Sequence, residues 1–124
     1  MTILAVGTWL AANPGLGRQM LAAGHELGNH TQHHANIKTM KPQLAYAEIS
    51  ACAEAVRAVS GSIGRWFRPS QTQYATPAIK AAARPGSIVS LHCGHEGTVA
   101  AIAPLLAGLR ARGLRPVTAT ELLT

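Results

Sequence analysis

The sequence contains no aspartate, and its five acidic residues are all glutamates set against 11 lysines and arginines. A mechanism that needs an aspartate from these 124 residues is therefore excluded. Aromatic residues make up only 4% of the chain, so a core must be built from Ala, Leu, Val and Ile. Hydrophobic residues at 48% and charged residues at 13% argue against intrinsic disorder and for a folded domain.

Long apolar runs are also missing. No run approaches the roughly 20 residues that cross a bilayer, so we expect no membrane span. Residues 1–7 carry no basic leader and have the pattern of a strand, so we expect no export signal in this chain. The formal charge of +6 is spread over scattered basic residues with few aromatics for base stacking, so we expect no nucleic-acid partner.

Only two cysteines occur, Cys52 and Cys93, and their spacing forms neither a CxxC pair nor a disulfide framework. Both are interpreted as small buried hydrophobic residues. Because Cys93 stands directly beside His92, a place at a functional site is the alternative for that residue.

Short β-like runs alternate with helical segments, which is typical of an α/β fold with a mainly parallel sheet. Strands are expected at residues 3–6, 25–31, 65–68, 87–92 and 116–119. Helices are expected at residues 14–23, 42–60, 76–85 and about 99–113, the last with Pro104 in its first turns, before a terminal turn at 121–123. The second helix is indicated by apolar residues at spacings of three and four between Pro42 and Gly61. We expect about five strands and four helices in a single domain spanning residues 1–124.

The densest chemical signal is a run at residues 30–34 that holds three of the six histidines. A bound Zn²⁺ takes neutral imidazoles from a short segment, together with ligands that the fold brings in. His30 and His34 are four residues apart and can meet if a turn or helix begins at Thr31. Histidines also cluster on solvated loops, so the pair indicates either a metal site or an exposed loop.

Two further signals, Arg68 and His92, lie at the ends of expected strands, and the carboxyl ends of parallel strands form the site face of a sheet. A histidine with a pKa near neutrality can serve there as general acid or base. The alternative for His92 is a half-buried strand-end residue held by one hydrogen bond. An arginine at such a place usually pairs with a carboxylate, and the sequence indicates no partner for Arg68.

These segments together resemble the polysaccharide deacetylase family. Residues 24–34 (GHELGNHTQHH) are close to the family's metal motif. The other matches are residues 3–7 with its second barrel strand, 67–69 (FRP) with its arginine motif, 90–92 (SLH) with its Leu-His motif, and 112–118 followed by 121–123 with its closing strand. The order of the motifs along nearly the whole chain makes the resemblance specific.

The resemblance implies an α/β fold in the form of an incomplete, distorted (β/α) barrel, a divalent metal (usually zinc), and removal of acetyl groups from N-acetylated or O-acetylated sugar polymers such as chitin oligomers or peptidoglycan. It makes His30 and His34 the metal-ligating histidines, and His92 the general acid for the leaving amine. It also makes Arg68 the residue that orients the catalytic base. Leu91 would line the acetyl pocket, and the Thr31 hydroxyl would stabilise the loop at the substrate.

The chain departs from the family pattern in three places. The family opens with a strand ending in two aspartates, a general base and a third metal ligand, and this chain starts just after that position. An Ala-rich stretch at residues 76–87 stands where the family has a further strand and an Asp-Trp motif, and Ser70 stands where it has a second proline. We therefore expect a truncated domain. The candidates to replace the missing ligand or base are Glu96, His95 and Glu26.

Three functions are consistent with these features. The first is a metal-dependent deacetylase whose missing groups have been replaced. The second is a catalytically impaired family member that binds metal or glycan. The third is a basic α/β domain whose exposed sheet edge pairs with a partner or with a second copy in a homodimer. Zinc binding that is lost in His30→Ala would support the first two, acetate release would separate them, and a concentration-dependent mass without zinc would support the third.

Overall fold

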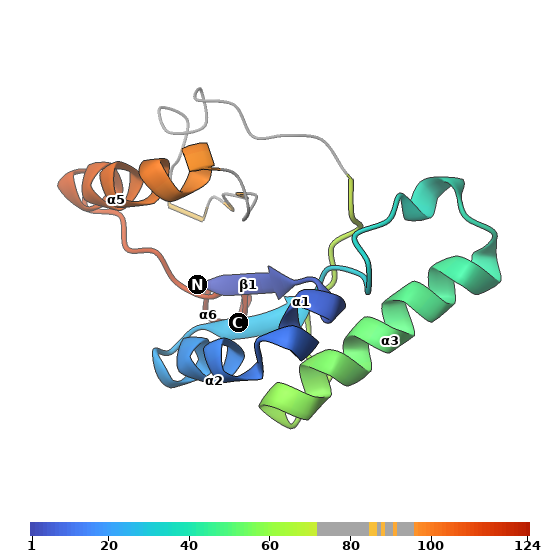
Figure 1. Ribbon diagram of the computed structural model, residues 1–124. Coiled ribbons are helices and arrows are strands. Elements are labelled where there is room, and N and C mark those ends of the chain that lie inside the picture. Colours follow the sequence, from blue (N-terminus) through green and yellow to red (C-terminus); the bar gives the residue numbers. More distant parts are fainter. Residues whose placement is uncertain (72–84, 87, 89–90, 92–95) are drawn as a thin grey trace. The chain divides into compact units, whose positions relative to one another are not determined.

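The structure is a computed structural model that describes residues 1–71, 85–86, 88, 91 and 96–124. The chain divides into two compact units, Met1–Thr72 and Gln73–Thr124 (Figure 1). Among the described residues, no helix is both long enough and apolar enough to span a membrane.

The sheet of the first unit consists of two parallel strands, β1 (Thr2–Ala5) and β2 (Glu26–Asn29). Parallel strands need a crossover connection, which is supplied here by helices α1 (Gly7–Ala12) and α2 (Pro14–Ala22). The two strands overlap the segments predicted to be extended, residues 3–6 and 25–31, with β1 beginning one residue earlier than expected. Their carboxyl ends meet at the same edge, because Ala5 is opposite Asn29 in the register.

The expected third strand at residues 65–68 is reduced to one isolated parallel bridge between Asn29 and Phe67. Two backbone bonds form it: Asn29 donates to the carbonyl of Trp66 at 2.8 Å, and the N–H of Arg68 donates to the carbonyl of Asn29 at 3.1 Å. The pairing stops there, because the N–H of Thr31 donates to Asn29 Oδ1 at 3.0 Å and the carbonyl of Arg68 lies 2.8 Å from His30 Nδ1. The segment therefore lies beside β2 without becoming a full strand.

Helix α1 was not anticipated from the sequence. It has only six residues, too few to display helical periodicity, and it ends just before the Asn13–Pro14 signal at which the sequence predicts the first helix start. Helix α2 begins at Pro14 as predicted. It is followed by Gly24, whose φ of 78° turns the chain toward β2.

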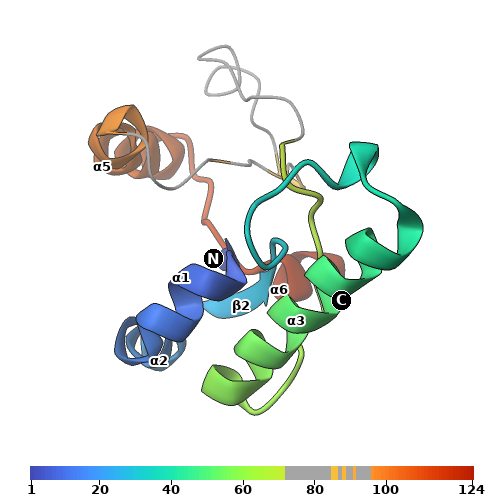
Figure 2. The same ribbon diagram turned by 45° about the vertical axis from the view of Figure 1, so that its right-hand side comes forward.

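Helix α3 (Pro42–Ser60) confirms the predicted helix at residues 42–60. It ends at Gly61, which has a φ of 77° and donates its N–H to the carbonyl of Arg57 at 2.8 Å. Figures 1 and 2 show α3 beside α1 and α2, and all three helices contact one another around the sheet. Their shared core consists of Ala5, Leu10, Leu27, Cys52 and Val56. A short 3-10 helix, η1 (Ile37–Thr39), precedes α3.

Cys52 is fully buried, as the sequence predicts for a small hydrophobic residue, whereas Cys93 lies outside the described residues. The Cys52 thiol donates to the carbonyl of Ala5 at 3.4 Å. Its burial raises the pKa of this thiol above the ordinary value, so the group stays protonated and inert.

The described part of the second unit contains helices α5 (Glu96–Ala111) and α6 (Ala119–Leu123). Pro104 lies inside α5, not in its first turns, because the helix begins at Glu96, earlier than expected. The expected strand at 116–119 is also wrong: Thr118 instead caps α6, its hydroxyl accepting the N–H of Glu121 at 3.1 Å. The helix predicted at 76–85 and the strand predicted at 87–92 fall largely outside the described residues.

Candidate functional site

The candidate site lies at the carboxyl ends of β1 and β2, where residues 30–35 form a loop. The loop is fixed to the start of α1 by backbone bonds. Gly7 donates its N–H to the carbonyl of Thr31 at 3.0 Å, and Thr8 donates to the carbonyl of the following residue, Gln32, at 3.0 Å. These two bonds hold the loop against the first turn of α1.

His30 and His34 come together at this loop. Their ring centroids are 4.9 Å apart, with an interplanar angle of 67°. A turn brings them together, since both Thr31 and His34 adopt left-handed backbone conformations with φ of 68° and 57°. Of the two ways in which the spacing could unite the histidines, the structure therefore has the turn and not the helix.

The ring of His30 is held in a defined orientation. It is 7% exposed, and its Nδ1 lies 2.8 Å from the backbone carbonyl of Arg68. A carbonyl only accepts hydrogen bonds, so Nδ1 carries the proton and, in the neutral ring, Nε2 has the lone pair that a metal binds. The backbone of Arg68 thus orients a candidate ligand, which sequence analysis missed because it considered only the arginine side chain.

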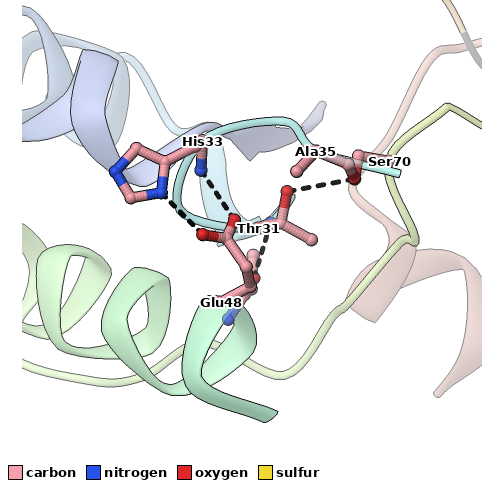
Figure 3. A network of polar contacts seen from close by, with 6 residues as sticks. Thr31, His33, Ala35, Glu48 and Ser70 are labelled. Atoms are coloured by element: carbon pink, nitrogen blue, oxygen red, sulfur yellow. Dashed lines mark hydrogen bonds and ion pairs between the residues drawn. The ribbon is translucent and has the colours of Figure 1, made fainter. Parts of the chain in front are cut away.

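The segment after Arg68 is hydrogen-bonded to the loop through Ser70 (Figure 3). The Thr31 hydroxyl donates to Ser70 Oγ at 3.1 Å, and the Ser70 hydroxyl donates to the carbonyl of Ala35. Gln71 Nε2 donates to the carbonyl of His34 at 3.3 Å. Thr31 and Ser70 are both fully buried, so this network ties together the two segments that carry His30, His34 and Arg68.

Glu48 on α3 holds the outer side of the loop, also shown in Figure 3. Its Oε2 accepts the backbone N–H of His33 at 2.9 Å, and its Oε1 accepts from His33 Nδ1 at 2.6 Å. Desolvation alone would raise the pKa of this carboxyl, but the hydrogen bonds from His33 outweigh it and hold the pKa below its ordinary value. Sequence analysis missed Glu48, although it is one of only five acidic residues in the chain.

The remaining predicted site residues lie at the other end of β2, in the second unit or outside the described residues. Glu26 begins β2, so it lies at the opposite end of the strand from His30, about 13 Å along at the usual strand rise. Leu91 is half-buried in the second unit, and Glu96 is the first residue of α5. His92 and His95 lie outside the described residues.

The two histidines fit part of a metal site. Rings that ligate one Zn²⁺ tetrahedrally through nitrogens at about 2.0–2.1 Å have centroids about 5 Å apart, close to the 4.9 Å separation seen here. Across the described ranges, no group of three or more His, Cys, Asp or Glu side chains is arranged to hold a metal ion. A complete zinc site needs at least one further protein ligand beyond this pair.

Two named relatives have sequences similar to this chain. A chitooligosaccharide deacetylase from Bradyrhizobium sp. is 29% identical over 160 aligned positions, which cover 90% of this chain and 73% of the relative. Since the chain has 124 residues, the relative carries residues with no counterpart here. A peptidoglycan-N-acetylglucosamine deacetylase, PgdA, from Listeria monocytogenes is 25% identical over 98% of this chain, which spans 32% of the relative.

Solved structures show the same fold. One, described as T48 deacetylase with substrate, has a TM-score of 0.85 at 23% identity. The match covers 98% of this chain and 75% of that protein's chain. Another is a CE4 family pseudoenzyme from Bacillus anthracis, with a TM-score of 0.81 at 21% identity over 99% of this chain and 55% of its own. The family model for polysaccharide deacetylase matches residues 1–87. Because that match covers more than half of the 124 residues of this chain, the chain belongs to the polysaccharide deacetylase family.

Proposed function

We propose that this chain is a metal-dependent hydrolase that removes acetyl groups from N-acetylated or O-acetylated sugar polymers. The observation that carries the proposal is the pairing of His30 and His34, with ring centroids 4.9 Å apart at the carboxyl ends of two parallel strands. The relatives named as chitooligosaccharide and peptidoglycan deacetylases support an acetylated glycan, such as chitin oligomers or peptidoglycan, as the partner.

His30 and His34 would hold Zn²⁺ or another divalent metal, and the hydrogen bond from His30 Nδ1 to the Arg68 carbonyl suits a ligating role. When bound, such a metal polarises an acetyl carbonyl and lowers the pKa of water. These 124 residues contain no aspartate, so any further ligand that they supply is another residue type. Glu96 and His95 are our candidates for the third ligand or the base, and Glu26 is dropped because it lies at the far end of β2.

His92 serves in this proposal as the general acid that protonates the leaving amine, because an imidazole titrates near neutrality. Arg68 orients the base through its side chain, in addition to orienting His30 through its carbonyl. Leu91 lines the acetyl pocket, and Thr31 stabilises the loop at the substrate through its bond to Ser70.

For the fold, we propose that residues 1–124 belong to one domain of the distorted (β/α) barrel type. The parallel β1–β2 pair and its helical crossover support this proposal. A strand edge left uncovered in such a barrel would offer a surface for a homodimer, which a concentration-dependent mass would reveal.

Acetate release from N-acetylglucosamine oligomers by the full chain with added Zn²⁺ or Co²⁺ tests the proposal. We expect turnover that is lost in His30→Ala and in His92→Ala. His25→Ala, which changes a histidine hydrogen-bonded to the amino terminus, is the matched control and should keep the activity.

The alternative function is a family member that has lost catalysis but still binds metal or glycan. It is favoured by the lack of a third metal-binding side chain beside His30 and His34 in the described residues. Zinc binding that depends on His30, without acetate release from any oligomer, would establish this alternative and overturn the hydrolase.

A further inference from the structure

The loop that carries the two histidines has a conformation that its own residues do not favour. Thr31 and His34 both lie in the left-handed region, with φ of 68° and 57°, and both have a Cβ that crowds the backbone there. Such residues persist when the surroundings over-determine them. The bonds that hold the residues between Thr31 and His34 therefore decide whether the two rings can meet.

Glu48 supplies three of these bonds from α3. Its backbone carbonyl accepts the N–H of Gln32 at 3.0 Å, and its carboxylate accepts both the N–H and the ring Nδ1 of His33, at 2.9 and 2.6 Å. The two bonded residues are the ones that separate Thr31 from His34. The Glu48 side chain is only 13% exposed, whereas that of His33 is 64% exposed, so the carboxylate is the fixed partner and the loop docks onto it.

We infer that Glu48 is a positioning residue for the metal-binding pair: by fixing the backbone at Gln32 and His33, it holds His34 beside His30 in the arrangement that a divalent cation needs. The inference rests on the proposed function, because it assigns the cation to these two histidines. Glu48 contributes no ligand itself, since no described group of three such side chains is arranged to hold a metal.

The opposite side of the loop has its own anchors, so removing Glu48 should loosen the loop without unfolding the unit. Ser70 and Gln71 still bond to the loop at Ala35 and His34. The amides of Gly7 and Thr8 still meet the carbonyls of Thr31 and Gln32. The exchange rates of these two amides therefore report the order of the loop, and Glu48 touches neither of them.

The experiment compares the full chain with Glu48→Ala and Glu48→Gln by calorimetric Zn²⁺ titration and by the visible spectrum of bound Co²⁺. The glutamine side chain can still accept the His33 N–H through its oxygen, so it should bind Zn²⁺ within about threefold of the natural chain. Glu48→Ala should bind about tenfold more weakly, the lower end of what second-layer partners of metal ligands contribute. It should also show an altered Co²⁺ spectrum.

Glu54→Ala is the matched control, since it removes a glutamate from the same helix whose side chain is 66% exposed and pairs only with Arg57 among the described contacts. It should leave Zn²⁺ affinity unchanged. If Glu48→Ala fails to fold by circular dichroism, Glu48→Asp takes its place, because the shorter side chain cannot reach both His33 atoms. The same loss of Zn²⁺ affinity is expected for that variant.

A folded Glu48→Ala or Glu48→Asp chain that binds Zn²⁺ as tightly as the natural one would overturn the inference. Failure of the proposed function has a different signature. The His30→Ala chain would then bind Zn²⁺ as tightly as the natural chain, which would show that binding does not depend on the histidines. In that case amide exchange still decides the positioning role in the metal-free chain. Faster exchange at Gly7 and Thr8 in Glu48→Ala than in Glu54→Ala supports it, and equal exchange rejects it.

Discussion

Replacing Ser70 with alanine removes the hydroxyl that joins the two segments of the candidate site. This hydroxyl is fully buried, accepts from Thr31 Oγ1 and donates to the carbonyl of Ala35. Each such bond contributes about 0.5–1.5 kcal/mol, and an unsatisfied buried partner costs about 1–3 kcal/mol. We therefore expect Ser70→Ala to lower the free energy of unfolding by about 2–3 kcal/mol.

Urea unfolding followed by circular dichroism measures this change as a lower midpoint at constant m-value. Ser62→Ala is the control, because Ser62 is exposed and its hydroxyl oxygen accepts only the nearby N–H of Gly64 at 3.2 Å among the described contacts. Its cost should stay near 0.5 kcal/mol, as for most surface substitutions. A midpoint for Ser70→Ala equal to that of Ser62→Ala would refute the reasoning that the buried network holds the loop.

Two glycines should respond to alanine with opposite signs. A Cβ at Gly7 would lie 2.0 Å from Gln32 Oε1 and 3.1 Å from the Cα of Cys52, so Gly7→Ala should destabilise the chain by about 1–3 kcal/mol. Gly15 in α2 has nothing within 4 Å of such a Cβ, so Gly15→Ala should raise the urea midpoint by the equivalent of about 0.5–1 kcal/mol. The pKa of Glu48 is lower in the folded than in the unfolded chain, so its stabilisation is present above about pH 4.3 and is lost as the pH falls through the folded pKa. The stability difference from Glu48→Gln should therefore shrink in acid, and a difference that is constant between pH 7 and pH 3 would contradict this.

The sequence predicts the elements whose signals are local. Helix α3 could be predicted because Pro42 and Gly61 bracket a periodic apolar face, and the parallel pairing of β1 with β2 agrees with the expected mainly parallel sheet. The errors have physical causes. Helix α1 is too short to show a period, and residues 65–68 have the composition of a strand but, within the described residues, pair with a neighbouring strand only at Asn29.

The candidate site was predicted in part for the same reason. The spacing of His30 and His34 is visible in the sequence, and the turn that unites them lies between them. Their supports come from far along the chain: the Arg68 carbonyl is 38 residues from His30, and the Glu48 carboxylate is 15 residues from His33. A backbone carbonyl has no sequence signature, and a glutamate on a helix looks like any exposed helical glutamate until the fold brings the loop to it.

Zn²⁺ titration of the full chain by calorimetry, with His30→Ala, His34→Ala and His25→Ala measured alongside, tests the central claim most directly. We expect one Zn²⁺ per chain, at least tenfold weaker binding in each of the first two variants, and unchanged binding in His25→Ala, whose ring bonds to the amino terminus. Binding that is absent from the natural chain, or that survives both substitutions, would contradict the claim that these two histidines form a metal site.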